Sequence, residues 1–242
     1  MEKIEAIVFK QIEYRENDFI ISLLTSDNKR FSLCLKAAKK PNSKTYVYGI
    51  IGNTYEYSIK DENSTFVNFI AASIITSRNK ITNSLIKIAI MNIMMEIVDK
   101  LTMEAVSYDH LYALLSFCLD KLNNDDHEFI TLALFICLIY KELGIEPAVD
   151  GCVVCDSKYI NALDIKNGGF VCSDHHQGML YYHNDINSLR KFRYLNKAML
   201  NDHDKLAKII EVDIKDIEIL VNFLQLHSGI KLNSFEFLES II

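Results

Sequence analysis

The sequence predicts an α+β protein in which a small closed β-barrel is followed by an all-α domain that carries a zinc-binding loop. Three observations predict this class. Short apolar runs separated by polar clusters fill residues 1–80, a helical spacing of apolar residues begins near residue 81, and two close pairs of metal-ligating residues lie at about 148–183. We therefore expect two domains, 1–80 and 81–242, the second with a zinc-finger insertion.

Five apolar runs predict five short strands in the first domain: AIVF, FIISLLT, RFSLCLKA, TYEYSI and FVNFIAASII. Segments between them, such as YREND and KDENS, contain Asn and Asp, whose side chains favour turns. In TYEYSI, Tyr55, Tyr57 and Ile59 alternate with polar residues, as a half-buried strand requires. Five strands with meander spacing predict an OB-type barrel, because closure removes exposed sheet edges.

Beyond residue 80, apolar residues recur every three or four positions, which predicts helices. The expected helices cover about 82–101, a segment from near Ser107, a segment from after Asp125 or Asp126 to Gly144, about 187–200, 202–211, 214–227 and a short segment from Asn233. The third is apolar on all sides between Phe129 and Tyr140, so we expect it at the centre of the helical core.

The net charge of −6 is unevenly distributed. Residues 1–80 contain 12 Lys and Arg against 9 Asp and Glu, whereas residues 81–242 contain 14 against 23. Because salt screens charges over about 10 Å, an anionic partner would bind the N-terminal part. The N-terminus lacks the regions of a signal peptide, and the longest apolar run is shorter than the roughly 20 residues of a membrane span. We expect a cytoplasmic protein with no membrane partner.

The most specific chemical signal is a pair of short motifs, GCVVC and VCSDHH. Cys152 and Cys155 have the same spacing as Cys172 and His175. Two ligands so spaced on a tight turn can bind one ion, and two such turns complete the tetrahedral set of a structural Zn²⁺ site. All four positions belong to the protein, which favours structural zinc, because a catalytic site keeps one position open.

Three alternatives remain open for this segment. His176 adjoins His175 and could be the fourth ligand instead, and His183 is a weaker candidate. Cys152 and Cys155 alone could be a thiol redox pair, although the second motif would then be a coincidence. The other cysteines lie in apolar stretches and are expected to pack in the core: Cys34, Cys118 and Cys137.

A lysine-rich segment, KAAKKPNSK, separates two expected strands. OB barrels bind nucleic acid with a cationic groove and aromatic rings, and such binding is sequence-tolerant and salt-dependent. The expected nucleic-acid-binding cations are Lys29, Arg30, Lys36, Lys39, Lys40 and Lys44. The aromatic candidates are Tyr46, Tyr48, Tyr55 and Tyr57. The alternative is a solvated loop beside tyrosines that face the core.

A second basic cluster lies in SLRKFRYLNKAML, on an expected amphipathic helix, and consists of Arg190, Lys191, Arg193 and Lys197. It could bind DNA or an acidic, hydrophobic peptide of a partner, or be the solvated face of an ordinary helix. The motifs GxxxxGK[ST], GxGxxG, GxSxG and HExxH are absent from the sequence. We therefore expect a binding protein and not an enzyme.

Four stretches of the chain, in order, resemble the RecO family. The opening AIVFKQIEYRENDFIISLLTSDNKRFSLCLKAAKK is similar to the family's first strands, with an E-x-D turn at Glu16 and Asp18. GCVVC and GGFVC resemble its zinc loop, and LRKFRYLNKAML resembles the segment after it. The end is similar to the family's closing H-x-G and K-S-x-x-F/L pattern, here His227, Gly229, Lys231, Ser234 and Leu238. The chain departs from the family pattern at two places. His175 stands where the family usually has a fourth cysteine, and Ala37 and Ala38 lie in a loop that usually carries Gly and Arg.

This resemblance implies a recombination mediator in DNA repair, associated with the nucleoid. Such a protein binds single- and double-stranded DNA without sequence specificity and anneals complementary strands. It acts with RecR on strands coated by single-strand-binding protein and helps to load RecA, without using ATP. The alternative is a zinc-stabilised protein-interaction module without intrinsic DNA binding.

Overall fold

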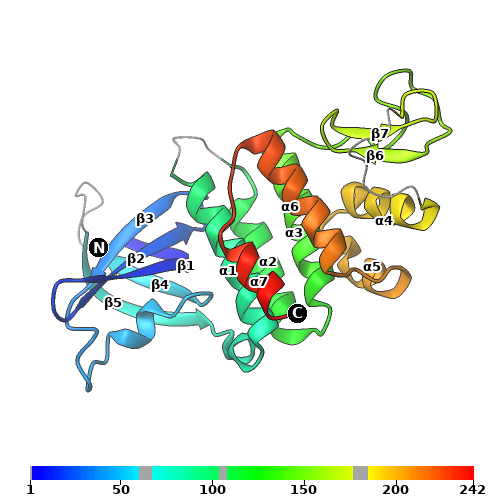
Figure 1. Cartoon of the computed structure of the whole chain (residues 1–242). Coiled ribbons are helices and arrows are strands. Elements are labelled where there is room, and N and C mark those ends of the chain that lie inside the picture. The colour runs from blue at the N-terminus through cyan, green and yellow to red at the C-terminus, as the bar shows by residue number, and fades with distance from the viewer. Residues whose placement is uncertain (1, 60–66, 104–107, 177–184) are drawn as a thin grey trace. The chain divides into compact units, whose positions relative to one another are not determined.

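The computed structural model describes residues 2–59, 67–103, 108–176 and 185–242. The chain forms two compact units, 1–124 and 125–242. The first contains a β-barrel and two helices, and the second contains further helices and a small sheet (Figure 1). The predicted α+β class is therefore confirmed. The compact units divide the chain after residue 124, because the two helices that follow the barrel belong to the same unit as the barrel. A functional boundary near residue 80 stays a prediction.

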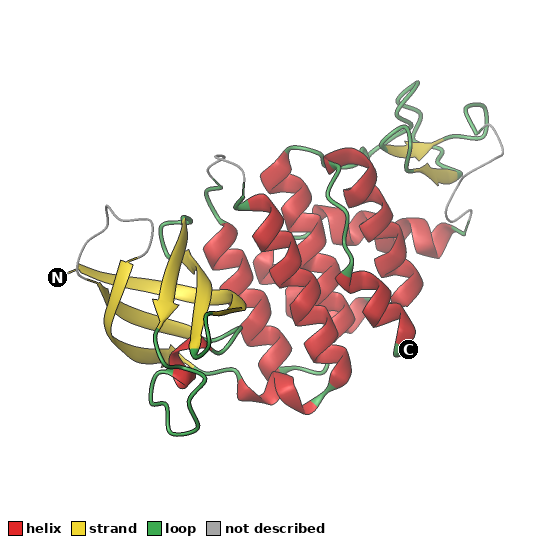
Figure 2. Cartoon of the chain, turned by 60° about the vertical axis from the view of Figure 1, so that its left-hand side comes forward, coloured by secondary structure: helices red, strands yellow, loops and turns green. Residues whose placement is uncertain are grey.

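Five strands form the closed barrel of the first unit: β1 (Glu2–Tyr14), β2 (Asp18–Thr25), β3 (Arg30–Leu35), β4 (Thr54–Ile59) and β5 (Val67–Thr76). Their order is β1-β2-β3-β5-β4, with β1 antiparallel to both β2 and β4, and β3 parallel to β5. Figure 2 shows the strands curling around a common interior. Every predicted strand is present. The register of β1 against β2 shifts between Val8 and Lys10, a bulge that bends the strand.

Alternating side chains fill this barrel. Tyr55, Tyr57 and Ile59 have no exposed surface, whereas the residues between them in β4 are partly exposed. They pack with Ala6, Val8, Ile21, Leu23, Leu33 and Leu35 from the neighbouring strands. The barrel therefore encloses a packed core and not a pore.

Two helices complete the first unit, α1 (Leu85–Leu101) and α2 (Leu111–Asn124). A 3-10 turn at Asn79–Asn83 precedes α1, so the helix begins later than predicted. Ser84 caps it, because the serine side chain accepts a hydrogen bond from the Lys87 N–H at 3.4 Å. The predicted helix start at Ser107 lies outside the described residues.

The second unit is organised around α3 (Glu128–Leu143). All residues from Ile130 to Tyr140 are buried, which confirms the expected central position of this helix within its unit. α3 ends at Gly144, which has a left-handed φ of 67° and is the predicted terminating residue. The remaining elements are β6 (Ala162–Asp164), β7 (Gly169–Val171), α4 (Ile186–Lys197), α5 (His203–Ile209), α6 (Ile214–Ser228) and α7 (Ser234–Ser240). No helix within the described residues combines the length and apolar character needed to span a membrane.

Candidate nucleic-acid interface and metal centre

The lysine-rich segment forms a surface loop over residues 36–45, which we call the basic loop; it joins β3 to a 3-10 turn. Asp18, the first residue of β2, accepts a hydrogen bond from the backbone N–H of Ala37 at 2.8 Å. At the other end of the loop, the Thr45 hydroxyl donates to the carbonyl oxygen of Lys36 at 3.2 Å. These bonds fix both ends of the loop, which gives Asp18 of the E-x-D turn a positioning role.

The lysines of the basic loop differ in their surroundings. Lys36, Lys40 and Lys44 are exposed, and none of them forms an ion pair with another described residue. Lys39 is partly buried, and its Nζ lies 2.7 Å from Oε2 of Glu13. Three of the four cations are therefore available to phosphate groups, whereas Lys39 would have to exchange its carboxylate partner.

The two predicted cations outside the loop have different roles. Lys29 is exposed in the turn before β3, with Nζ 2.5 Å from Oδ2 of Asp27. Arg30 faces α1 instead: its Nη1 lies 2.8 Å from Oδ1 of Asp99, and its guanidinium carbon lies 5.0 Å from the ring centre of Phe9. Arg30 therefore has a structural role that joins the barrel to α1, and its binding to phosphate stays a prediction.

Among the four aromatic candidates, Tyr46 is the exposed one. It keeps 49% of its surface in solvent, and its ring centre lies 6.3 Å from that of Phe19. Tyr48 is partly buried, and Tyr55 and Tyr57 are buried inside the barrel. The hydroxyls of Tyr55 and Tyr57 donate to backbone carbonyls of the 3-10 turn that carries Tyr46, at 2.5 and 2.6 Å. The two buried tyrosines therefore support the exposed one.

Tyr46 and the basic loop border an open groove of about 350 Å³. Its lining combines aromatic, apolar and cationic groups: Phe19, Ala38, Lys39, Lys40, Pro41, Ser43 and Tyr46. Stacking surfaces combined with cations are what single-strand-binding grooves use. The sequence did not single out Phe19, because it stands in an apolar run that signals only a strand.

The four predicted metal ligands lie together in the second unit. The sulfur atoms of Cys152, Cys155 and Cys172 and a ring nitrogen of His175 are all within 4.8 Å of one another. The sulfurs of Cys155 and Cys172 are 3.8 Å apart, and Nδ1 of His175 lies 3.6 and 3.2 Å from the sulfurs of Cys152 and Cys172. Tetrahedral zinc, with bonds of about 2.3 Å to sulfur and about 2.0 Å to nitrogen, requires separations of about 3.8 and about 3.5 Å. The group could therefore hold one metal ion.

Two tight turns present these ligands. The N–H of Asp156 donates to the carbonyl of Cys152 at 2.9 Å, and the N–H of His175 donates to the carbonyl of Cys172 at 3.2 Å. The apolar cluster around the site is small, and its buried members are Cys152, Ala162, Val171 and Cys172. A bound ion would therefore contribute directly to the folding of this segment. The weaker candidate ligand His183 lies outside the described residues.

The surroundings of the thiols favour one thiolate. Desolvation raises the pKa of Cys152, but the backbone N–H groups of the two turns outweigh it and lower the pKa to about 6. The pKa of Cys155 is raised, although the Ser157 N–H acts to lower it, because desolvation and the neighbouring sulfurs of Cys152 and Cys172 outweigh that bond. A cation among the sulfurs would remove this repulsion.

The predicted partner-binding helix, α4, uses most of its cations inside the second unit. Nζ of Lys191 lies 2.6 Å from Oδ2 of Asp216 on α6. Arg193 pairs with Asp150 at 2.8 Å, and Lys197 pairs with the same carboxylate. These ion pairs join α4 to α6 and to the segment just before the cysteine–histidine group, so most cations of α4 already have carboxylate partners inside the second unit.

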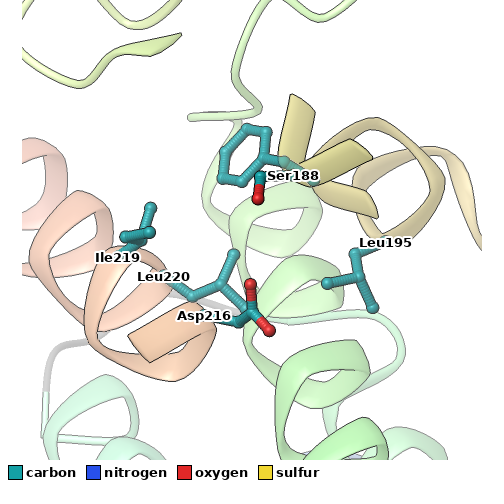
Figure 3. Close-up of a pocket in the computed structure, with 6 residues that line it drawn as sticks. Ser188, Leu195, Asp216, Ile219 and Leu220 are labelled. Atoms are coloured by element: carbon teal, nitrogen blue, oxygen red, sulfur yellow. The ribbon is translucent and has the colours of Figure 1, made fainter. Parts of the chain in front are cut away.

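Figure 3 shows the pocket between α4 and α6, lined by Ser188, Phe192, Leu195, Asp216, Ile219 and Leu220. Its volume of about 10 Å³ leaves space for no more than one water molecule, so it is no ligand site. Arg190 is exposed and makes no ion pair within the described part of the chain. Partner binding through this helix stays a prediction, with Arg190 as its available cation.

Comparisons with known proteins match both parts of the chain. Models described as Recombination protein O N terminal and Recombination protein O C terminal match residues 1–78 and 82–236. The DNA repair protein RecO of Exiguobacterium sibiricum is 25% identical over 252 residues, covering 100% of this chain and 98% of that protein. The RecO of Bacillus cytotoxicus is 23% identical, covering 99% and 97%, and that of Shouchella clausii is 27% identical, covering 72% and 68%.

The β-barrel, the helical unit and the two family models that match them define a protein of DNA repair and recombination. The chain belongs to the recombination protein O family, RecO, and the resemblance that the sequence motifs indicate is confirmed.

Proposed function

We propose that the chain is a non-enzymatic recombination mediator that binds single- and double-stranded DNA without sequence specificity. The observation that supports this function best is the basic loop, which carries three exposed lysines without ion pairs to other described residues: Lys36, Lys40 and Lys44. The loop borders a groove whose lining includes Lys40 and the exposed ring of Tyr46. Lysines follow a phosphate backbone, while an aromatic ring stacks on bases. Lysine gives point contacts in place of the forked contacts of arginine, which lowers the affinity. The binding depends strongly on salt, because each neutralised phosphate releases counterions.

In this proposal the protein anneals complementary strands and, together with RecR, helps to load RecA at the nucleoid on strands coated by single-strand-binding protein. Family membership supports these partners. The basic loop holds the backbone of the strand while the coating protein is displaced. The cysteine–histidine group holds a structural Zn²⁺, because all four ligands come from the protein and leave no position open for catalysis.

The test is the affinity for a fluorescent single-stranded oligonucleotide, measured by anisotropy at several salt concentrations. The variant Lys36→Ala/Lys40→Ala/Lys44→Ala removes the available cations of the basic loop. Its affinity at low salt falls by at least about tenfold, and the slope of log K against log salt becomes shallower by about 2, since single strands contribute about 0.7 per phosphate contact.

The matched control is Lys166→Ala/Lys205→Ala/Lys208→Ala, which removes the same charge from exposed positions of the second unit. The control keeps the wild-type slope. Equal affinities of the two triple variants would contradict the assigned surface. A wild-type chain that binds no DNA at low salt would favour the protein-interaction module instead.

A further inference from the structure

The turn between β1 and β2, residues 15–17, is hydrogen-bonded to the basic loop. The N–H of Lys39 donates to the carbonyl oxygen of Asn17 at 3.0 Å. One residue further on, the side chain of Asp18 accepts the bond from the N–H of Ala37 described above. The turn therefore borders the proposed DNA interface, although its one cation, Arg15, is not among the residues assigned to that interface.

Arg15 is an exposed cation with a defined orientation. Its φ is 51°, in the left-handed region that residues other than glycine rarely adopt. Its guanidinium carbon lies over the ring of Tyr14, 5.1 Å from the ring centre. Arg15 is exposed and forms no ion pair with another described residue. A guanidinium over a ring face directs its in-plane N–H donors away from the ring, where an anion can accept them.

The thiol of Cys34 shows that Arg15 and Lys36 lie near one another. The residues before and after Cys34 in β3 are fully buried, so Cys34 itself faces the outside of the barrel. Burial raises the pKa of this thiol and the charge of Asp18 adds to the rise, whereas the charges of Lys36 and Arg15 act to lower it. Because the energy between charges falls with distance, both cations lie close to this one point on the barrel surface.

The carboxylates of the same region already have partners in the basic loop. Oδ1 of Asp18 accepts the Ala37 N–H at 2.8 Å, and Oε2 of Glu13 lies 2.7 Å from Nζ of Lys39. These contacts leave the guanidinium of Arg15 to an anion from outside the chain.

We propose that Arg15 binds a phosphate group of the DNA strand, next to the phosphates bound by Lys36. This inference rests on the proposed function, because it assigns a further contact to the same strand. The planar guanidinium forms forked contacts with two phosphate oxygens, which the lysines of the basic loop cannot form. The bound strand then extends from the Tyr46 groove, along the basic loop, to the β1–β2 turn.

Anisotropy of a fluorescent single-stranded oligonucleotide, measured with the full chain at several salt concentrations, tests this contact. Arg15→Ala weakens binding at low salt by at least about threefold, and the slope of log K against log salt becomes shallower by about 0.7, the contribution of one phosphate contact. Arg15→Lys keeps the slope, because the charge remains, but weakens binding by about twofold, because the forked contact is lost.

Two controls separate the guanidinium from the turn and from net charge. Glycine adopts a left-handed φ without strain, so Arg15→Gly keeps the turn and weakens binding as much as Arg15→Ala does. Lys166→Ala removes one exposed positive charge from the second unit and keeps the affinity and slope of the wild type.

The variant Lys36→Ala/Lys40→Ala/Lys44→Ala, measured in the same series, distinguishes failure of this inference from failure of the proposed function. If the triple variant loses affinity while Arg15→Ala keeps the affinity and slope of the wild type, Arg15 contacts no phosphate and only this inference is overturned. It is also overturned if Arg15→Gly binds as the wild type does, or if Lys166→Ala has the same effect as Arg15→Ala. A wild-type chain that binds no DNA overturns both.

Discussion

Nε of Arg78 lies 2.7 Å from Oδ1 of Asp120, and this contact connects the end of the barrel to α2. The Arg78 side chain is 1% exposed and also donates to the carbonyl oxygen of Gly52 at 2.7 Å and to the Thr54 hydroxyl at 2.9 Å. A single buried guanidinium thus satisfies acceptors on two elements of the first unit. A buried charge is tolerated where its hydrogen bonds are complete, as they are here.

The two ends of this ion pair differ in importance for stability. Arg78→Ala leaves buried acceptors without a donor and lowers the free energy of unfolding by about 3–5 kcal/mol, which lowers the melting temperature of the full chain by at least about 6 °C. Asp120→Asn removes a carboxylate that is 48% exposed and keeps an oxygen acceptor, so it costs only about 1 kcal/mol. Calorimetry on both variants measures the difference. Equal melting temperatures of the two would show that the hydrogen bonds to the barrel are unimportant.

Asp99 of α1 lies between two cations of the barrel, with Lys10 at 2.6 Å and Arg30 at 2.8 Å. Burial acts to raise the pKa of Asp99, but the hydrogen bonds from Lys10 and Arg30 outweigh it, and the pKa is lowered. Its pKa in the folded chain is therefore below that in the unfolded chain. The corresponding stability is fully present above the unfolded value of about 3.9 and is lost as the pH falls through the folded value.

Asp99→Asn removes this pH-dependent contribution. At pH 7 the variant is less stable than the wild type by about 1.5–3 kcal/mol, the usual contribution of hydrogen bonds to a charged group. The difference shrinks as the pH falls below about 4, because the wild-type carboxylate also loses its charge. Melting temperatures across this pH range measure it. Glu56→Gln, which removes the exposed partner of Lys3, is the control and changes stability by less than about 1 kcal/mol. A constant difference at all pH values would contradict the role of the Asp99 charge.

Local signals explain why much of this molecule could be predicted. The strand alternation at Tyr55 and Tyr57, the all-apolar stretch of α3 and its terminating Gly144 each depend on neighbours within a few residues. The clustering of the cysteine–histidine group is also predictable, because each pair lies on one tight turn and its short spacing brings two side chains together.

Long-range pairing explains what the sequence could not show. In the sequence, Arg30 is one cation of a basic cluster. In the fold it pairs with Asp99, which lies 69 positions away. Lys197 likewise pairs with Asp150, 47 positions away. Charge along the sequence reveals where cations occur, whereas only the fold reveals which of them already have a carboxylate. Tyr46 differs from Tyr55 for the same reason, since one ring lies outside the barrel wall and the other inside it.

The cysteine–histidine group predicts that the folding of residues 148–176 depends on a bound metal ion. Cys155→Ser removes one of the four proposed ligands, so we expect the metal affinity to fall by at least about 100-fold. The segment then unfolds, because the small apolar cluster around the site cannot replace the stabilisation by the ion. Metal analysis of the purified protein gives the stoichiometry. Hydrogen exchange shows lost amide protection in residues 148–176 and retained protection in β1 and β2.

Two comparisons give this experiment its controls. Cys34→Ser changes a partly buried thiol outside the group and keeps the metal content of the wild type. The affinity of Cys155→Ser for single-stranded DNA stays within about twofold, because the ion acts on the folding of its own segment. Ready formation of a disulfide between Cys152 and Cys155, with no loss of metal, would favour the redox interpretation.

We expect the loss of the Tyr46 ring to weaken binding to single-stranded DNA more than binding to double-stranded DNA. Tyr46→Ala removes the exposed ring and weakens binding to a single-stranded oligonucleotide by about 1–3 kcal/mol, or roughly 5- to 150-fold, because one stacked base is lost. Tyr46→Phe keeps the ring and stays within about twofold. Duplex binding changes less, because paired bases are already stacked on one another and the contacts are mainly to phosphates. Anisotropy with both substrates measures the effect, with Tyr159→Ala, at 90% exposure in the second unit, as the matched control. If Tyr46→Ala and Tyr159→Ala bound single strands equally well, the ring would have no stacking role, and the lysines of the basic loop alone would account for the affinity.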